Sequence, residues 1–126
     1  MILELNVLPG VFAVCRLDPT AELPGDRAGS GAFWSATRTA DELSVICAEE
    51  AIPDGAVVER GWRGLRVAGP LDFALTGVAA ALTAPLAAAG VSVLPVATFD
   101  TDYLFVRAEA LPRALAALAA AGHVVP

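Results

Sequence analysis

The densest group of polar side chains that could do chemistry lies at residues 98–102, between two apolar runs. Asp100 and Asp102 supply two carboxylates there, and Thr98 supplies a hydroxyl. Asp and Thr also close hairpin turns, because they hydrogen-bond nearby backbone amides. Asp102 opens an apolar strand, where a carboxylate beside apolar walls suits the ammonium group of a small ligand. We therefore expect Asp102 to hold a ligand cation and Asp100 to belong to the turn.

A second polar group lies at residues 68–73, directly before a helical pattern. Free backbone amides at a helix start bind anions, carboxylates included. Asp72 fits the N-cap of this helix, a contribution of about 1 kcal/mol, but a capping Asp72 would occupy the amides that a ligand carboxylate needs. We therefore expect the carboxylate of a bound amino acid farther along, near Thr76 and Gly77. Gly77 has no packing need that alanine would not meet, which favours close approach of a ligand or of another backbone.

The sequence contains no recognisable catalytic set. Ser35 and Ser44 have no histidine that the sequence can place beside them, because His123 lies in the C-terminal tail. Cys15 and Cys47 lie in apolar alternating segments and are expected to be buried free thiols. A single histidine without a close cysteine pair does not assemble a zinc-type ligand set. We therefore expect a protein that is not an enzyme, with no cofactor and no metal.

The second half of the chain is predicted to supply the elements that position these residues. Its hydrophobic period indicates strand 63–69, helix 73–89, strand 91–97, strand 102–107, helix 110–121 and a terminal strand. This βαββαβ order is the ferredoxin-like arrangement of an α+β protein. Both helices would then pack on one face of the sheet, and the other face would need a partner.

Three residues mark the ends and the interior of the two predicted helices. Gly90 and Gly122 each follow a helix at the position that takes a positive φ. Pro85 lies inside the first helix and removes the hydrogen bond to the carbonyl of Ala81, so a kink is expected there. The apolar face of this helix is predicted to comprise Leu75, Val78, Ala79, Leu82, Leu86 and Ala89.

The first half is strand-rich. Apolar runs at residues 2–8, 11–17, 33–38 and 43–48 predict strands, and Pro9-Gly10 marks a turn between the first two. Residues 57–61 are predicted to link the two halves. We therefore divide the chain into a strand-rich unit at residues 1–60 and a βαββαβ unit at residues 61–126.

Composition and charge exclude several classes of partner. The chain has 126 residues and a net charge of −6, with no lysine, which argues against binding nucleic acid. Residues 73–99 carry no charge and are long enough to span a bilayer. Glycine and proline interrupt this stretch, however, and basic residues do not cluster at its ends, so no membrane partner is expected. The N-terminus has an acid where an export signal has basic residues, which favours a cytoplasmic protein.

Five segments resemble the ACT-domain family. They are LSVIC at residues 43–47, GWR at 61–63, VAGPLDF at 67–73, LTAPLA at 82–87 and ATFDTDY at 97–103. The similar branch holds small tandem-ACT proteins related to cytosolic arginine sensors and to the regulatory part of aspartate kinases. The resemblance covers about residues 43–121 and is fainter before them.

This resemblance implies two ACT-like units packed together, the first of them shortened and strand-rich. Small ligands, typically amino acids, would lie at the seam between units. Carried over to this chain, the ligand-binding residues would be Ser44 and Val45 of the first unit, and Asp72, Thr76, Gly77, Val78, Thr98, Phe99 and Asp102 of the second. The expected function is therefore a non-enzymatic, amino-acid-binding regulatory module that forms a homodimer. The alternative is a protein–protein interaction or oligomerisation module with a vestigial pocket.

Overall fold

The chain forms two compact units. The computed structural model describes residues 1–25 and 32–126, so residues 26–31 of the predicted first unit lie outside the described part. Unit 1 comprises Met1–Leu8 and Arg63–Pro126, and unit 2 comprises Pro9–Trp62. Unit 2 is therefore an insertion, since the chain leaves unit 1 after Leu8 and re-enters it at Arg63. The predicted strand-rich unit at residues 1–60 includes Met1–Leu8.

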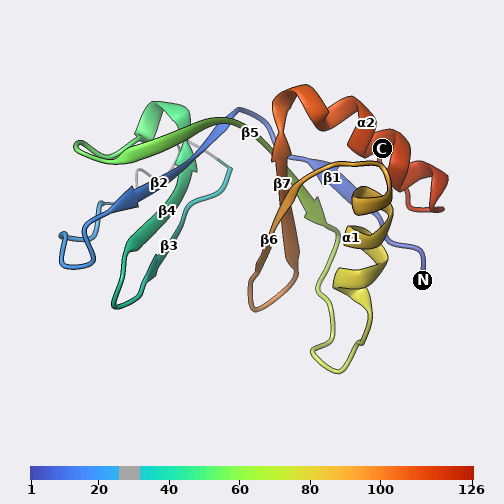
Figure 1. Cartoon of the computed structure of the whole chain (residues 1–126). Helices are drawn as coiled ribbons and strands as arrows, with labels where there is room; N and C mark the ends of the chain where they lie inside the picture. Colours follow the sequence, from blue (N-terminus) through green and yellow to red (C-terminus); the bar gives the residue numbers. More distant parts are fainter. Residues whose placement is uncertain (26–31) are drawn as a thin grey trace. The chain divides into compact units, whose positions relative to one another are not determined.

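Unit 1 is an α+β structure in which two helices pack on a sheet (Figure 1). The strands lie in the order β1-β5-β7-β6. Their bounds are β1 Leu5–Val7, β5 Val57–Val67, β6 Val93–Ala97 and β7 Asp102–Arg107; the helices are α1 Val78–Ala88 and α2 Leu111–Ala120, the latter preceded by a 3-10 turn, η2 Ala108–Ala110. The predicted α+β class is confirmed, as is the order strand, helix, strand, strand, helix. The predicted link at residues 57–61 is wrong, because those residues are already part of β5.

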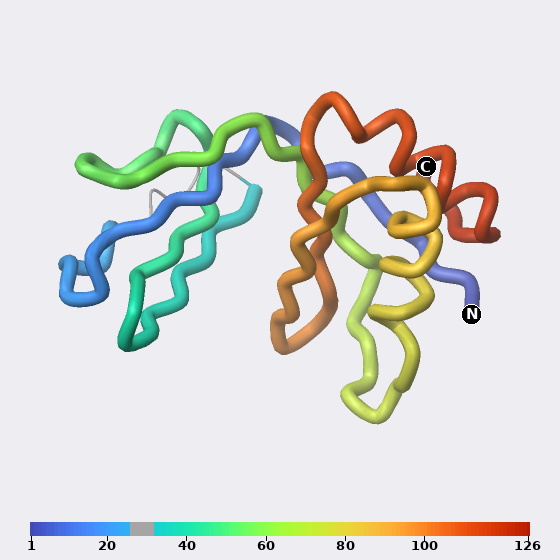
Figure 2. The backbone as a smooth tube through the Cα atoms, in the orientation of Figure 1, coloured from blue at the N-terminus to red at the C-terminus, as the bar shows by residue number. Residues whose placement is uncertain are grey.

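The predicted terminal strand is also wrong, because only one residue of the tail pairs. Val124 forms a single parallel bridge with Glu4. The adjacent Leu5 N–H donates a hydrogen bond to the Val124 carbonyl at 2.8 Å. The place beside β5 is taken by β1, which pairs antiparallel with Leu5 opposite Val67. The N-terminal segment thus satisfies the backbone groups of β5, and both ends of the chain belong to unit 1 (Figure 2).

The predicted helix 73–89 is too long at its start, since α1 begins at Val78. Gly77 precedes it with φ 81°, a left-handed conformation that ends any helical path arriving from residue 73. The predicted helix ends are confirmed, because Gly90 and Gly122 have φ values of 73° and 95°. Pro112 lies in the first turn of α2, where its missing N–H has no helical partner to lose.

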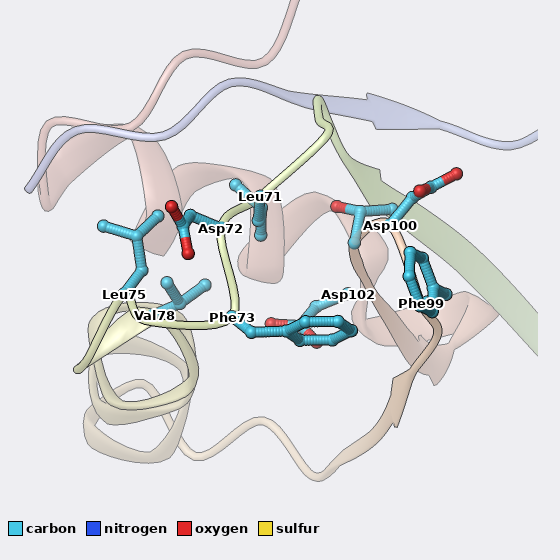
Figure 3. Close-up of a pocket in the computed structure, with 9 residues that line it drawn as sticks. Leu71, Asp72, Phe73, Leu75, Val78, Phe99, Asp100 and Asp102 are labelled. Atoms are coloured by element: carbon cyan, nitrogen blue, oxygen red, sulfur yellow. The ribbon is translucent and has the colours of Figure 1, made fainter.

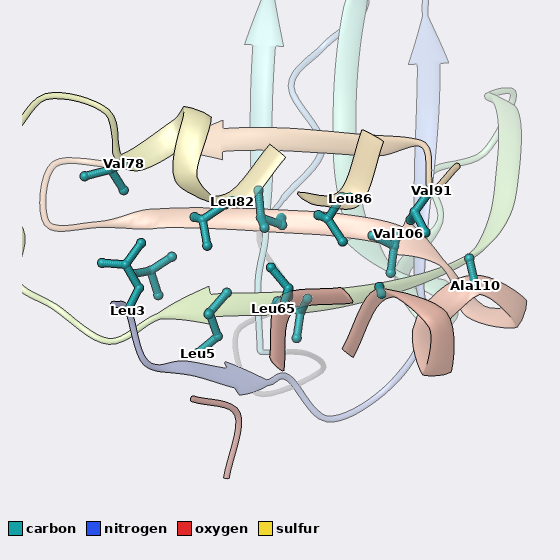
Figure 4. Close-up of a cluster of buried hydrophobic side chains, with 13 residues drawn as sticks. Leu3, Leu5, Leu65, Val78, Leu82, Leu86, Val91, Val106 and Ala110 are labelled. Carbon is teal, nitrogen blue, oxygen red and sulfur yellow. The ribbon is translucent and has the colours of Figure 1, made fainter. Parts of the chain in front are cut away.

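The core of unit 1 lies between the sheet and its two helices (Figure 4). Alternate residues of the central strands face the helices and are buried, including Leu65 of β5 and Leu104 of β7. Leu82 and Leu86 of α1 are fully buried against them. The other buried members are Leu3, Leu5, Val67, Val78, Val91, Val106, Ala110, Ala114 and Leu118. The uncharged stretch after residue 73 is therefore largely a core helix and the strand that follows it.

Unit 2 is a sheet in the order β3-β4-β2-β5, to which β5 contributes its first half. The strands are β2 Phe12–Leu17, β3 Ser35–Arg38 and β4 Leu43–Ala48, and a 3-10 turn, η1 Glu49–Ala51, follows β4. The pairing of β2 with β5 contains a bulge, at which Gly61 adopts φ 80°. The Gly61 N–H, which the bulge removes from the ladder, donates to Glu49 Oε2 at 2.9 Å.

Both cysteines are free thiols in the core of unit 2, as predicted. Burial raises the pKa of Cys15. Burial, reinforced by the neighbouring Cys15 thiol, raises the pKa of Cys47 from 9.0 to about 12. Both thiols therefore stay protonated at neutral pH and act as small apolar side chains.

We expect the free energy of unfolding to fall as the pH rises from 9.0 toward about 12. Within this window Cys47 loses its proton in the unfolded chain but keeps it in the folded one, so the unfolded state binds fewer protons. The contribution of the Cys47 thiol to the free energy of unfolding is fully present below pH 9.0 and is lost above about pH 12. Urea unfolding of wild type and of Cys47→Ala on both sides of pH 9.0 measures the effect. An equal pH dependence in the two proteins would contradict it.

Candidate functional site

The hairpin between β6 and β7 is closed by two threonines. The Thr98 N–H donates to the Thr101 carbonyl at 2.9 Å, and the Thr98 hydroxyl donates to the same oxygen at 3.0 Å. The Thr101 side chain is buried, and its hydroxyl donates to the Val67 carbonyl at the end of β5 at 2.7 Å. This buried bond fixes the turn to the centre of the sheet. The sequence did not single out Thr101, because a turn threonine carries no sign of such a distant partner.

The loop between β5 and α1 is fastened to the same turn. The Leu71 N–H donates to the Asp100 carbonyl at 2.7 Å. Asp72 does not cap α1, contrary to the sequence prediction, because its Oδ1 accepts the Ala74 N–H at 2.8 Å in a local turn of its own. No side chain caps the first turn of α1, whose N-cap residue is Gly77. The predicted competition between Asp72 and a ligand for the α1 amides is therefore absent.

A pocket of about 140 Å3 lies where this loop meets the hairpin (Figure 3). The residues that line it are Leu71, Asp72, Phe73, Leu75, Val78, Phe99, Asp100, Thr101 and Asp102. Its most prominent feature is an edge-to-face pair of aromatic rings, Phe73 and Phe99, whose centroids are 5.0 Å apart at 84°. The two rings are 74% and 80% exposed, so the pocket is open to solvent on that side.

The two acids of the hairpin differ in orientation. In Figure 3 the Asp102 side chain overlaps the Phe73 ring, whereas the Asp100 carboxylate points away from both rings. Asp102, at the first position of β7, is half-buried, and Asp100 is exposed. The pocket lining contains three carboxylates and no Lys, Arg or His, so it favours a positively charged group. Within the described part of the chain, no three His, Cys, Asp or Glu side chains come together as metal ligands would.

The pocket brings together four of the nine residues that sequence reasoning proposed for ligand binding: Asp72, Val78, Phe99 and Asp102. Thr76 and Gly77 lie in the adjoining loop, and Thr98 is engaged in the hairpin turn, so none of the three lines the pocket. Ser44 and Val45 lie in unit 2. Ser44 is half-buried opposite Arg16, and Val45 is fully buried in the unit 2 core.

The sequence missed Phe73 and Leu75 as pocket residues. Leu75 lies three residues before Val78, so it is predicted to belong to the apolar face of the helix, and Phe73 is predicted to be the first residue of that helix. The structure places both in the loop before α1, where they are exposed. The available signal was Gly77, because a glycine at that position can end the helix early and return the preceding apolar residues to the surface.

Gly69 allows the loop to pass close to the hairpin. A Cβ at this position would lie 3.1 Å from the Asp100 carbonyl oxygen and 3.1 Å from Thr101 Cβ. We expect Gly69→Ala to lower the free energy of unfolding by about 1–3 kcal/mol, because a backbone oxygen cannot move aside as a flexible side chain would. Gly25→Ala is the matched control, since nothing lies within 4 Å of its added Cβ. Equal chemical denaturation midpoints for the two variants would contradict the close approach.

Comparison with known proteins agrees with this architecture. A sequence profile of the ACT domain matches residues 57–120, which is half of the chain. The chain belongs to the ACT-domain family. A second profile, described as an N-terminal domain, matches residues 10–55 of this ACT protein. Comparison with curated proteins gives no match.

Three solved structures are similar to this ACT protein. A protein from Agobacterium tumefaciens is 36% identical with a TM-score of 0.91, over 100% of this chain and 93% of that one. A Vibrio cholerae protein of unknown function, described as a possible transport protein, is 19% identical with a TM-score of 0.72, over 94% and 89% of the two chains. Aspartate kinase from Clostridium acetobutylicum, described as an allosteric enzyme, is 12% identical with a TM-score of 0.66, over 90% of this chain and 33% of the kinase.

The similarities to the Vibrio cholerae protein and to the aspartate kinase show a shared fold. In residues 1–25 and 32–126 of this ACT protein, no helix combines the length and the hydropathy needed to cross a membrane.

Proposed function

We propose that this ACT protein is a non-enzymatic regulatory module that binds a free amino acid in the pocket beside Asp102. The observation that carries the proposal is that one pocket is lined both by the Asp102 carboxylate and by Val78, the first residue of α1. A carboxylate suits the positive end of an amino acid, and a helix start suits its negative end.

The cationic end of the ligand would lie against Asp102. This carboxylate lines the same pocket as the Phe73 ring (Figure 3), and the lining contains no basic side chain that could neutralise it. The aromatic pair adds to the attraction, because the face of a phenyl ring favours a nearby ammonium or guanidinium group. Asp102 is the proposed contact, and Asp100 serves the turn through its carbonyl bond to Leu71.

The carboxylate end would lie at the start of α1. Its first amides have no partner inside the helix, and no side chain caps them. The dipole of an 11-residue helix adds partial positive charge at this end. Asp72, the one acid in the preceding loop, is held by the Ala74 N–H. Thr76, Gly77 and Val78 lie directly before and at the start of α1. A ligand carboxylate placed there would therefore lie beside these three residues.

The regulatory part of the proposal is a seam between ACT units. Ligand sites bury about 70–90% of a drug-sized ligand, whereas both phenyl rings here are mostly exposed. A further wall would therefore come from a second copy of this chain. A ligand that binds at such a seam has a higher affinity for one arrangement of the units than for another. It stabilises the arrangement that it binds more tightly, by the difference between the two binding free energies. We propose that the protein acts in this way in the cytoplasm as a homodimer, and the description of the similar kinase as allosteric supports this role.

Isothermal titration of the pure protein with each common amino acid tests the proposal. Binding at millimolar concentration or tighter is the expected result for at least one of them. A screen in which no amino acid binds would rule the sensor function out. Thermal shift measured in the same buffers serves as the second readout, because a ligand that binds only the native state raises the melting temperature.

The exposure of Phe73 and Phe99 favours one alternative function, a protein–protein interaction module with a vestigial pocket. Analytical ultracentrifugation distinguishes the two functions. Self-association that needs no amino acid and is lost in Phe99→Ser supports the alternative. Self-association that changes when an amino acid is added supports the sensor.

A further inference from the structure

Helix α1 contains one carbonyl without a helical partner. Pro85 has no N–H, so the carbonyl of Ala81, four residues earlier, cannot receive the hydrogen bond that a regular helix would give it. Ala81 packs against the core of unit 1, where water is largely excluded. A carbonyl in that position must find another donor or remain unsatisfied at a cost in free energy.

The donor is the single histidine of the chain. His123 Nε2 lies 2.8 Å from the Ala81 carbonyl oxygen, and His123 Nδ1 accepts the Leu3 N–H at 3.1 Å. Because Nδ1 accepts a hydrogen bond from the Leu3 N–H, it carries no proton of its own, so the ring proton is on Nε2, which donates a hydrogen bond to the Ala81 carbonyl. The side chain is buried. One neutral imidazole therefore connects the C-terminal tail, the N-terminal segment and α1.

We infer that His123 is a positioning residue that completes α1 at Pro85 and fixes the first turn of the helix, and with it the wall of the Asp102 pocket. Val78 begins this turn and lines the pocket. Leu3, the second partner of the imidazole, lies at the same end of the core as Val78 (Figure 4). The inference goes beyond the proposed function, because it concerns the free protein and needs no ligand.

The inference can be tested by giving the Ala81 carbonyl a different hydrogen-bond donor. In Pro85→Ala a new N–H at position 85 can donate to Ala81, so α1 no longer depends on the imidazole. His123→Ala alone is expected to accelerate amide hydrogen exchange in the first half of α1 and at Leu3 by about tenfold or more, because both bonds are lost. In the double variant the exchange of α1 should return close to that of Pro85→Ala, whereas that of Leu3 should stay fast.

The amide chemical shifts of Gly77 and Val78 report on the pocket wall in the same samples. They should move in His123→Ala and return in the double variant. Failure of the second substitution to restore α1 would overturn the inference, as would unchanged α1 exchange in His123→Ala. For the wild type, 15N spectra of the imidazole should show the proton on Nε2, and a proton on Nδ1 would overturn the inference without any variant. These results are independent of the amino-acid screen.

Discussion

Asp102→Asn is expected to weaken the binding of an amino acid by about 10- to 100-fold, while the fold is unchanged. Asparagine keeps the shape of the side chain but removes the charge, and a hydrogen bond to a charged group contributes about 1.5–3 kcal/mol. The residue is half-buried, so solvent screens its charge less than it would at the open surface. Isothermal titration with the amino acid that binds most tightly to the wild type measures the change.

Asp100→Asn is the matched control for this experiment. It makes the same change of charge two residues away, on a side chain that points away from the aromatic pair. Its affinity should stay within about threefold of the wild type, because exposed charges are screened by water and salt. An equal loss of affinity in both variants would mean that the ligand responds to the summed negative charge of the turn. It would contradict the proposal that Asp102 contacts the ligand directly.

The second large effect concerns the core. Leu82→Ala is expected to lower the free energy of unfolding by about 2–5 kcal/mol, because it removes a buried side chain from a close-packed interior and leaves a cavity. Leu82 is fully buried between α1 and the sheet. Denaturant unfolding monitored by circular dichroism measures the loss for unit 1.

Leu75→Ala makes the same substitution on a leucine that the sequence placed on the same helical face as Leu82. In the structure Leu75 lies before α1 and is 48% exposed, so its truncation is expected to cost less than about 1 kcal/mol. A cost equal to that of Leu82→Ala would return residue 75 to the helix and contradict the observed start of α1.

The parts of unit 1 that sequence reasoning predicted well depend on local interactions. The strand at residues 102–107 coincides with β7, and the preceding hairpin turn lies where Thr98 and Asp100 indicated it. Both helices were found as well, because leucine recurs at helical spacing and glycine marks each helix end. In each case the residues that determine the structure lie within a few positions of one another, so the sequence pattern contains the necessary information.

The errors arise where two interactions compete or where the partner is distant in sequence. The spacing of Leu75 from Val78 and Leu82 continues a helical pattern, but the Asp72 turn and the positive φ of Gly77 prevail over it. The place beside β5 could be filled by the N-terminal segment or by the tail, since both are short and apolar, and no local signal favours β1. Of the candidate site, Asp102 was proposed from the turn itself and Phe99 from the resemblance to the ACT family. Thr101 was missed because its hydrogen-bond partner, Val67, is distant in the sequence.

The insertion of unit 2 into unit 1 determines the order in which the protein can fold during synthesis. Leu5 leaves the ribosome early, but its strand partner Val67 follows only after all of unit 2 has been made. Unit 2 is therefore complete on the nascent chain while β1 is still an unpaired apolar segment. Pairings that span a long stretch of chain form slowly, and domains generally fold as units from the N-terminus. During this interval β1 cannot make the pairing with β5 that it has in the folded protein.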